Sequence, residues 1–152
     1  MFMTATGHAL VGALIAGKIS NPLISVPLAF ASHFVCDYIP HWDEGTYWRK
    51  KSRLRLFNET VVDVVISLTL SFVLYRNILL QSDYVSLYLC VFAAQFPDWI
   101  ASMHLILGIN NPIFIWVEKV QGGINRKLDK PWGIVTQACT VVLLYTVLYK
   151  IF

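Results

Sequence analysis

The chain has 152 residues, of which 57% are hydrophobic and only 14% are charged, whereas ordinary soluble domains are roughly 45–50% apolar and about 25% charged. This composition argues against a soluble domain and predicts an integral membrane protein, built as a single domain over residues 1–152. The formal net charge of +3 is too small to indicate nucleic-acid binding, so we expect no nucleic-acid partner.

The apolar segments predict an all-α fold, a small up-down bundle of four to five transmembrane helices with an added interfacial segment. The first helix is rich in glycine and alanine, which lets helices approach closely in lipid and leaves a homo-oligomer open. The pair Asn21-Pro22 begins the second helix and Pro40 ends it. We expect helices over 4–19, 22–39, 57–80, 84–96 and 132–152.

The region after Pro97 is open to two interpretations. Residues 98–108 either continue the 84–96 helix with a kink or lie along the membrane surface. Residues 111–130 are predicted to be interfacial, because apolar and charged side chains can face opposite sides of a helix there. The site-bearing bundle is thus expected over 4–104, the interfacial segment over 105–130 and the last transmembrane helix over 132–152.

Basic residues are unevenly distributed between the two sides of the predicted bundle. Five lysines or arginines lie in the loop 41–56 and four in the region 110–130, whereas the opposite side has only Lys18, Arg76 and Lys150. By the positive-inside rule we expect the first side to be cytoplasmic, in a multi-pass protein of the cell (inner) membrane.

The candidate ligands gather at one end of the predicted bundle. His33 and Asp37 lie one helical turn apart in a strongly apolar helix, and His41 follows that helix. In an up-down bundle, the start of an odd helix and the end of an even helix share one face, which adds His8 and Asp98. Ionisable groups are costly in apolar spans, so this gathering indicates a functional site.

Imidazole and carboxylate groups at such a site are typical ligands of divalent metals. We predict one or two ions, with zinc favoured and manganese, iron or magnesium as alternatives, because a divalent cation compensates crowded carboxylates. Glu59 and Asp63, one turn apart early in the 57–80 helix, are predicted to supply a catalytic general base. Asp43 and His104 are left open as further members of the site.

Three short motifs carry a resemblance to a known family. They are Thr6-Gly7-His8 in the first helix, His33-x-x-x-Asp37 with a following Pro40-His41, and Phe96-Pro97-Asp98. Over residues 4–104 the chain resembles the predicted membrane-bound metal-dependent hydrolases, also described as LexA-regulated inner-membrane hydrolases. The motif order departs from the family pattern, since the His-x-x-x-Asp element here precedes the Pro-Asp element. The resemblance implies metal roles for His8, His33, Asp37, His41 and Asp98.

The leading hypothesis is a membrane-embedded metal-dependent hydrolase that acts on a lipid or lipid-linked ester or phosphoester at the membrane face. The expected partners are membrane lipid and a phospholipid-like substrate, whose phosphate Arg53 or Arg55 would hold. One alternative is a divalent metal or proton transporter, although ligands confined to one face argue against a transport pathway. The other is a non-enzymatic membrane assembly protein.

Overall fold

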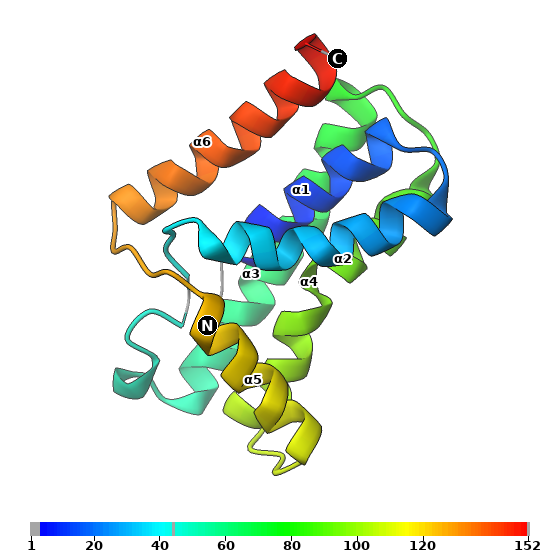
Figure 1. Ribbon diagram of the computed structural model, residues 1–152. Helices are drawn as coiled ribbons and strands as arrows, with labels where there is room; N and C mark the ends of the chain where they lie inside the picture. Colours follow the sequence, from blue (N-terminus) through cyan, green and yellow to red (C-terminus); the bar gives the residue numbers. More distant parts are fainter. Residues whose placement is uncertain (1–3, 44, 152) are drawn as a thin grey trace.

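The computed structural model describes residues 4–43 and 45–151, and this part of the chain is all-α, as predicted, with no β-strand (Figure 1). Its six α-helices are α1 (Ala5–Lys18), α2 (Pro22–Tyr38), α3 (Arg53–Val73), α4 (Tyr84–Leu105), α5 (Pro112–Ile124) and α6 (Trp132–Thr146). A 3₁₀ turn, η1 (Trp48–Lys50), precedes α3, and two π-helical segments, η2 (Leu74–Ile78) and η3 (Val147–Ile151), extend α3 and α6.

Helix α1 is the central element of the bundle. It packs against α2, α3, α4 and α6, whereas α5 packs against α4 and α2 and lies below them in Figure 1. Its buried face includes Ala9 and Ala13. Between them, a Cβ on Gly12 would lie only 2.8 Å from the carbonyl oxygen of Cys90 and 3.2 Å from the Cβ of Ala94. Small residues therefore let the backbones of α1 and α4 approach closely, as expected of helices that pack in lipid.

Large apolar side chains cover the outside of the bundle, while small and polar ones fill much of its inside. On α6, Val142 and Leu143 are 62% and 63% exposed, whereas Ser67, Gln95 and Gln121 are 0% exposed. A soluble protein shows the opposite tendency. Three helices are long and apolar enough to cross a membrane, and α1 and α2, with 14 and 17 residues, are shorter than the about 20 residues that a span needs. The three long helices comprise Arg53–Ile78, Tyr84–Leu105 and Trp132–Ile151.

Two helix boundaries differ from the predicted ones for identifiable reasons. Helix α3 begins at Arg53 rather than at residue 57, because the side chain of Ser52 caps it by accepting a hydrogen bond from the backbone N–H of Arg55 (3.2 Å). Helix α4 runs through Pro97 to Leu105, so the interpretation as a continued helix is correct. The predicted end of the last helix at residue 152 lies outside the described residues.

The segment that follows α5 pairs with the segment that follows α2. The backbone N–H of His41 donates to the carbonyl of Arg126 (3.0 Å), and the N–H of Leu128 donates to the carbonyl of His41 (2.7 Å). The N–H of Arg126 in turn donates to the carbonyl of Asp37 (3.0 Å). This parallel pairing, a β-bridge between His41 and Lys127, brings the two basic regions to one side of the molecule and holds α5 beside the end of α2.

Gly12→Ala is expected to lower the thermal unfolding temperature of the purified protein in detergent, because the added Cβ would collide with the carbonyl of Cys90. Overpacking of this kind costs about 1–3 kcal/mol, more than the roughly 0.5–1 kcal/mol that alanine contributes to a helix relative to glycine. Gly122→Ala on α5 is the matched control, since nothing lies within 4 Å of its added Cβ. A Gly12→Ala protein as stable as the control variant would contradict the close contact of α1 and α4.

Candidate metal centre

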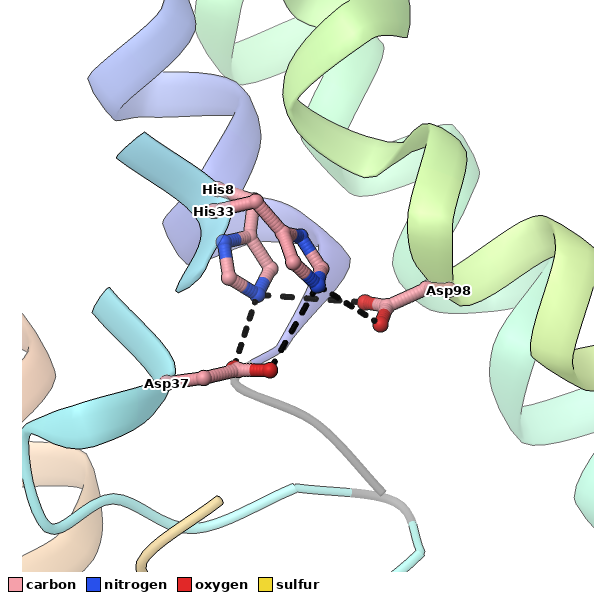
Figure 2. A group of neighbouring side chains, drawn as sticks. All are labelled: His8, His33, Asp37 and Asp98. Carbon is pink, nitrogen blue, oxygen red and sulfur yellow. Dashed lines mark ion pairs between the residues drawn. The ribbon is translucent and has the colours of Figure 1, made fainter. Parts of the chain in front are cut away.

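Four ionisable side chains from three helices meet in the interior of the bundle. They are His8 from α1, His33 and Asp37 from α2, and Asp98 from α4, and one ligand atom of each lies within 4.8 Å of the others (Figure 2). The side chains of the first three are fully buried, and that of Asp98 is 14% exposed. The sequence predicted that these four residues share one site with His41, and the structure brings the four together.

The distances within this His/Asp group match those between ligands of one metal ion. The Nε2 atom of His8 lies 3.3 Å from Asp37 and 3.8 Å from Asp98, and the Nε2 atom of His33 lies 3.4 Å and 3.3 Å from the same carboxylates. Hydrogen bonds from N–H to oxygen span about 2.7–3.2 Å. Tetrahedral zinc ligands, each about 2.0–2.2 Å from the ion, lie about 3.3–3.6 Å from one another. The spacing therefore suits ligands better than hydrogen-bond partners.

Backbone carbonyls fix the protonation of two imidazole rings. The Nδ1 atom of His33 lies 2.8 Å from the carbonyl oxygen of Ala94, and the Nδ1 atom of His41 lies 2.6 Å from that of Ile39. A carbonyl oxygen only accepts hydrogen bonds, so Nδ1 must carry the proton in both rings. The Nε2 atom of each ring then presents a lone pair, which is the arrangement found in histidines that bind metals.

The proline in α4 lies close in the chain to the carbonyl that contacts His33. Pro97 has no N–H to donate to the carbonyl one turn earlier, at Ala93, so the helical hydrogen bonding is interrupted there. The next carbonyl, that of Ala94, accepts the hydrogen bond from the His33 ring. The same proline directly precedes Asp98, so the break in α4 lies between two positions that contribute to the site.

His8 lacks any hydrogen-bond partner among the described residues. Its side chain is stacked on the ring of His33, with ring centroids 4.1 Å apart, and the residue is only 1% exposed. Neither of its ring nitrogens forms a hydrogen bond. Leaving a buried polar atom unsatisfied costs about 1–3 kcal/mol, so a metal ion bound at Nε2 would remove a cost that the protein alone leaves in place. The donor set of two imidazoles and two carboxylates fits a divalent ion.

His41, the fifth predicted metal ligand, lies next to the His/Asp group and is not one of its four members. Its Nε2 atom is 3.8 Å from Asp37 Oδ1 and has no hydrogen-bond partner within the described part of the chain. Burial lowers the pKa of His41 below its ordinary value, which keeps the ring neutral at neutral pH. Asp43, which the sequence left open, is 2% exposed and accepts a hydrogen bond from the hydroxyl of Thr46 (2.9 Å).

Asp63, a predicted general base, holds the start of α1. Its carboxylate accepts hydrogen bonds from the backbone N–H groups of Ala5 and Thr6 and from the hydroxyl of Thr6 (2.6 Å). A carboxylate at a helix N-terminus satisfies otherwise unpaired N–H groups and is favoured by the helix dipole. Asp63 therefore fixes the turn of α1 that carries His8, and its catalytic role stays a prediction.

Glu59, the other predicted base, forms ion pairs with Lys51 (2.6 Å) and Arg55 (2.8 Å) and lies outside the His/Asp group. Its catalytic role and the substrate role of Arg55 also stay predictions. Arg53 is exposed, with its guanidinium against Gly108.

A polar cavity of about 330 Å³, called the basic cavity below, is lined by Trp42, Lys51, Arg55, Glu59, Asp63 and Lys130, among others.

Gln121 is a site residue that the sequence interpretation missed. Its side-chain amide nitrogen lies 3.0 Å from His33 Nε2 and 3.4 Å from Asp98 Oδ1, and the residue is completely buried. The segment 111–130 was interpreted as interfacial and placed outside the site-bearing bundle of residues 4–104. A signal was present, because Phe114, Val117 and Gln121 share one helical face, and an amide on an apolar face needs a buried partner.

Comparison of the chain with family models, with curated proteins and with solved structures gives no match in any of the three. The interpretation of the site therefore depends on its residues and their geometry.

The purified protein is expected to carry about one tightly bound divalent ion per chain, measured by elemental mass spectrometry after dialysis. His33→Ala is expected to lower the metal affinity by about 100-fold or more. Removing a residue that only hydrogen-bonds to a metal ligand already lowers the affinity by about 10–100-fold, and His33 is a proposed ligand itself. His104→Ala is the matched control, since this histidine pairs with Glu118 (3.6 Å) outside the group. A wild-type protein without stoichiometric metal, or a His33→Ala protein that keeps all of it, would rule out this centre.

Proposed function

We propose that this protein is a metal-dependent hydrolase of a cell membrane that acts on a lipid or lipid-linked ester or phosphoester. The observation that carries the proposal is the buried group of His8, His33, Asp37 and Asp98, with ligand-like spacing and an unsatisfied imidazole. Such a group is costly to bury, and proteins retain polar clusters inside apolar bundles mainly where they serve a function.

The long apolar helices and the exposed apolar side chains support a membrane location. Three helices have the length and composition of spans, and the most exposed positions of α6 are apolar. We propose that the chain crosses the inner membrane several times. Because the two basic regions lie on one side of the molecule, at the same end as His41, the positive-inside rule assigns that side to the cytoplasm.

The ligands favour zinc, and manganese or iron can use the same donors. A divalent ion held by the four residues supplies Lewis-acid polarisation of a scissile ester bond and acidification of a water molecule. The protein's own residues hold the rings and carboxylates in place: Ala94 orients His33, and Asp63 anchors the helix that carries His8. His41 presents the lone pair of Nε2 beside Asp37, because its Nδ1 atom is hydrogen-bonded to the carbonyl of Ile39.

The basic cavity is suited to the polar headgroup of a lipid. Lys51, Arg55 and Lys130 supply three positive charges, and the carboxylates of Glu59 and Asp63 compensate two of them. Asp63, one of the residues that line the cavity, is hydrogen-bonded to the first turn of α1, the helix that carries His8. Lysine and arginine side chains at a membrane surface favour anionic headgroups, so we propose a phosphate-bearing lipid as substrate.

Hydrolysis of lipids tests this function directly. The metal-loaded protein in vesicles is expected to release products from an anionic phospholipid, with activity lost on chelation and restored by added zinc. Asp98→Asn should reduce kcat/KM by about 100-fold or more, because a metal ligand is lost from the transition state, while His104→Ala should retain wild-type activity. A metal-loaded protein that hydrolyses no ester or phosphoester in a lipid panel, or an Asp98→Asn protein of full activity, would contradict the proposal.

A further inference from the structure

The amide of Gln121 is the one buried side chain of α5, a helix that the structure describes over its whole length. Burying an amide is costly unless both its nitrogen and its oxygen have partners. The Nε2 atom lies 3.0 Å from His33 Nε2 and 3.4 Å from Asp98 Oδ1. The Oε1 atom has no hydrogen-bond partner among the described residues. Helix α5 therefore reaches the His/Asp group through an amide that is only half satisfied.

The protonation of His33 decides which end of the amide faces its ring. The Nδ1 atom carries the proton, because it contacts the carbonyl oxygen of Ala94, so Nε2 presents a lone pair. Only the nitrogen end of the amide can donate a hydrogen bond to this lone pair, since the oxygen end would place two lone pairs against each other. The hydrogen bond that Gln121 donates to His33 thus leaves the amide oxygen buried without a partner.

A metal ion at His33 would reverse this preference. The lone pair of Nε2 can serve either the Gln121 amide or a metal ion, but not both. The N–H groups of the amide carry partial positive charge and would then point toward a cation, whereas an amide oxygen is itself a ligand for divalent ions. Rotation of the terminal amide exchanges its nitrogen and its oxygen in nearly the same positions. The oxygen would thereby gain the partner that it lacks.

The position of the amide suits a further ligand of the same ion. Two ligand atoms at right angles, each about 2.1 Å from an ion, lie about 3.0 Å apart, and tetrahedral ligands lie somewhat farther apart. The amide atom that faces the group lies at such distances from His33 and from Asp98. Zinc in catalytic sites expands from four to five ligands, so a fifth ligand is compatible with the four residues of the group.

We propose that Gln121 is a fifth ligand of the metal centre, bound through its Oε1 atom, and that the metal ion thereby fastens α5 to the bundle. This inference rests on the metal centre of the proposed function, but it requires neither hydrolysis nor a lipid substrate. It adds a fourth helix to the site, since the residues of the His/Asp group come from α1, α2 and α4.

The zinc affinity of purified variants tests the ligand. Gln121→Leu has an apolar side chain of similar size, and we expect it to bind zinc about tenfold more weakly or worse, since loss of a residue that supports a metal site costs about 10–100-fold. An amide that only donates to His33 would give the opposite sign, because its removal would end the competition for Nε2. Gln121→Glu, which restores an oxygen, should bind zinc at least as tightly as the wild type.

The matched control is Gln95→Leu on α4. Gln95 is also completely buried, and its amide is hydrogen-bonded to Ser67 and to the carbonyl of Val91, outside the group. This variant should keep the wild-type zinc affinity. Zinc binding that Gln121→Leu leaves unchanged or tightens, or a Gln121→Glu protein that binds zinc as weakly as Gln121→Leu, would overturn the proposal.

Backbone hydrogen exchange of the wild-type protein tests the link to α5 without a substitution. Zinc is expected to slow exchange in α5, because a ligand on this helix ties it to three others. In Gln121→Leu at saturating zinc, exchange should still slow in α2 but no longer in α5. An α5 whose exchange ignores zinc in the wild type, while His33→Ala abolishes zinc binding, would refute the fifth ligand alone. A wild-type protein that binds no zinc would remove this inference together with the metal centre.

Discussion

Two carboxylates enclosed by an apolar bundle are the constraint on which the rest of this structure depends. Withdrawing a carboxylate from water costs several kcal/mol unless another charge compensates it. Within the described part of the chain, Asp98 pairs with the imidazoles of His8 and His33, which are neutral when they act as ligands. A divalent ion would compensate the charges of both carboxylates and accept the lone pairs of both rings. One bound ion would therefore remove the free-energy cost of burying all four side chains.

The helix packing around this group sets the distances between the ligand atoms. Gly12 lets α1 approach α4 closely enough for His8 to lie beside Asp98, and Asp63 fixes the rotation of α1 at its first turn. Pro97 interrupts the hydrogen bonds of α4 next to the carbonyl that orients His33. Ligand geometry is thus a consequence of backbone contacts one turn away, and α5 packs against α4 and α2 of the same arrangement.

The sequence was sufficient to bring the four residues of the His/Asp group together, because helical periodicity and alternating chain direction decide which helix ends meet, but it also predicted His41 as a ligand, which lies beside the group. It was insufficient for side chains whose partners come from loops. Glu59 was predicted as a base from its spacing to Asp63, but it pairs with Lys51, which precedes α3. Gln121 was missed because the docking of α5 depends on backbone pairing between the segments after α2 and α5, which no local pattern indicates.

X-ray absorption spectroscopy of the zinc-loaded protein tests the central claim most directly, because it reports the atoms bound to the metal without a substrate. We expect a first shell of nitrogen and oxygen at about 2.0–2.2 Å with the outer-shell scattering of two imidazoles and with no sulfur. His8→Ala should reduce the imidazole contribution to one ring, since His8 and His33 are the two histidines of the group. A shell that contains sulfur, or one without imidazole scattering, would contradict the assignment of the metal to this site.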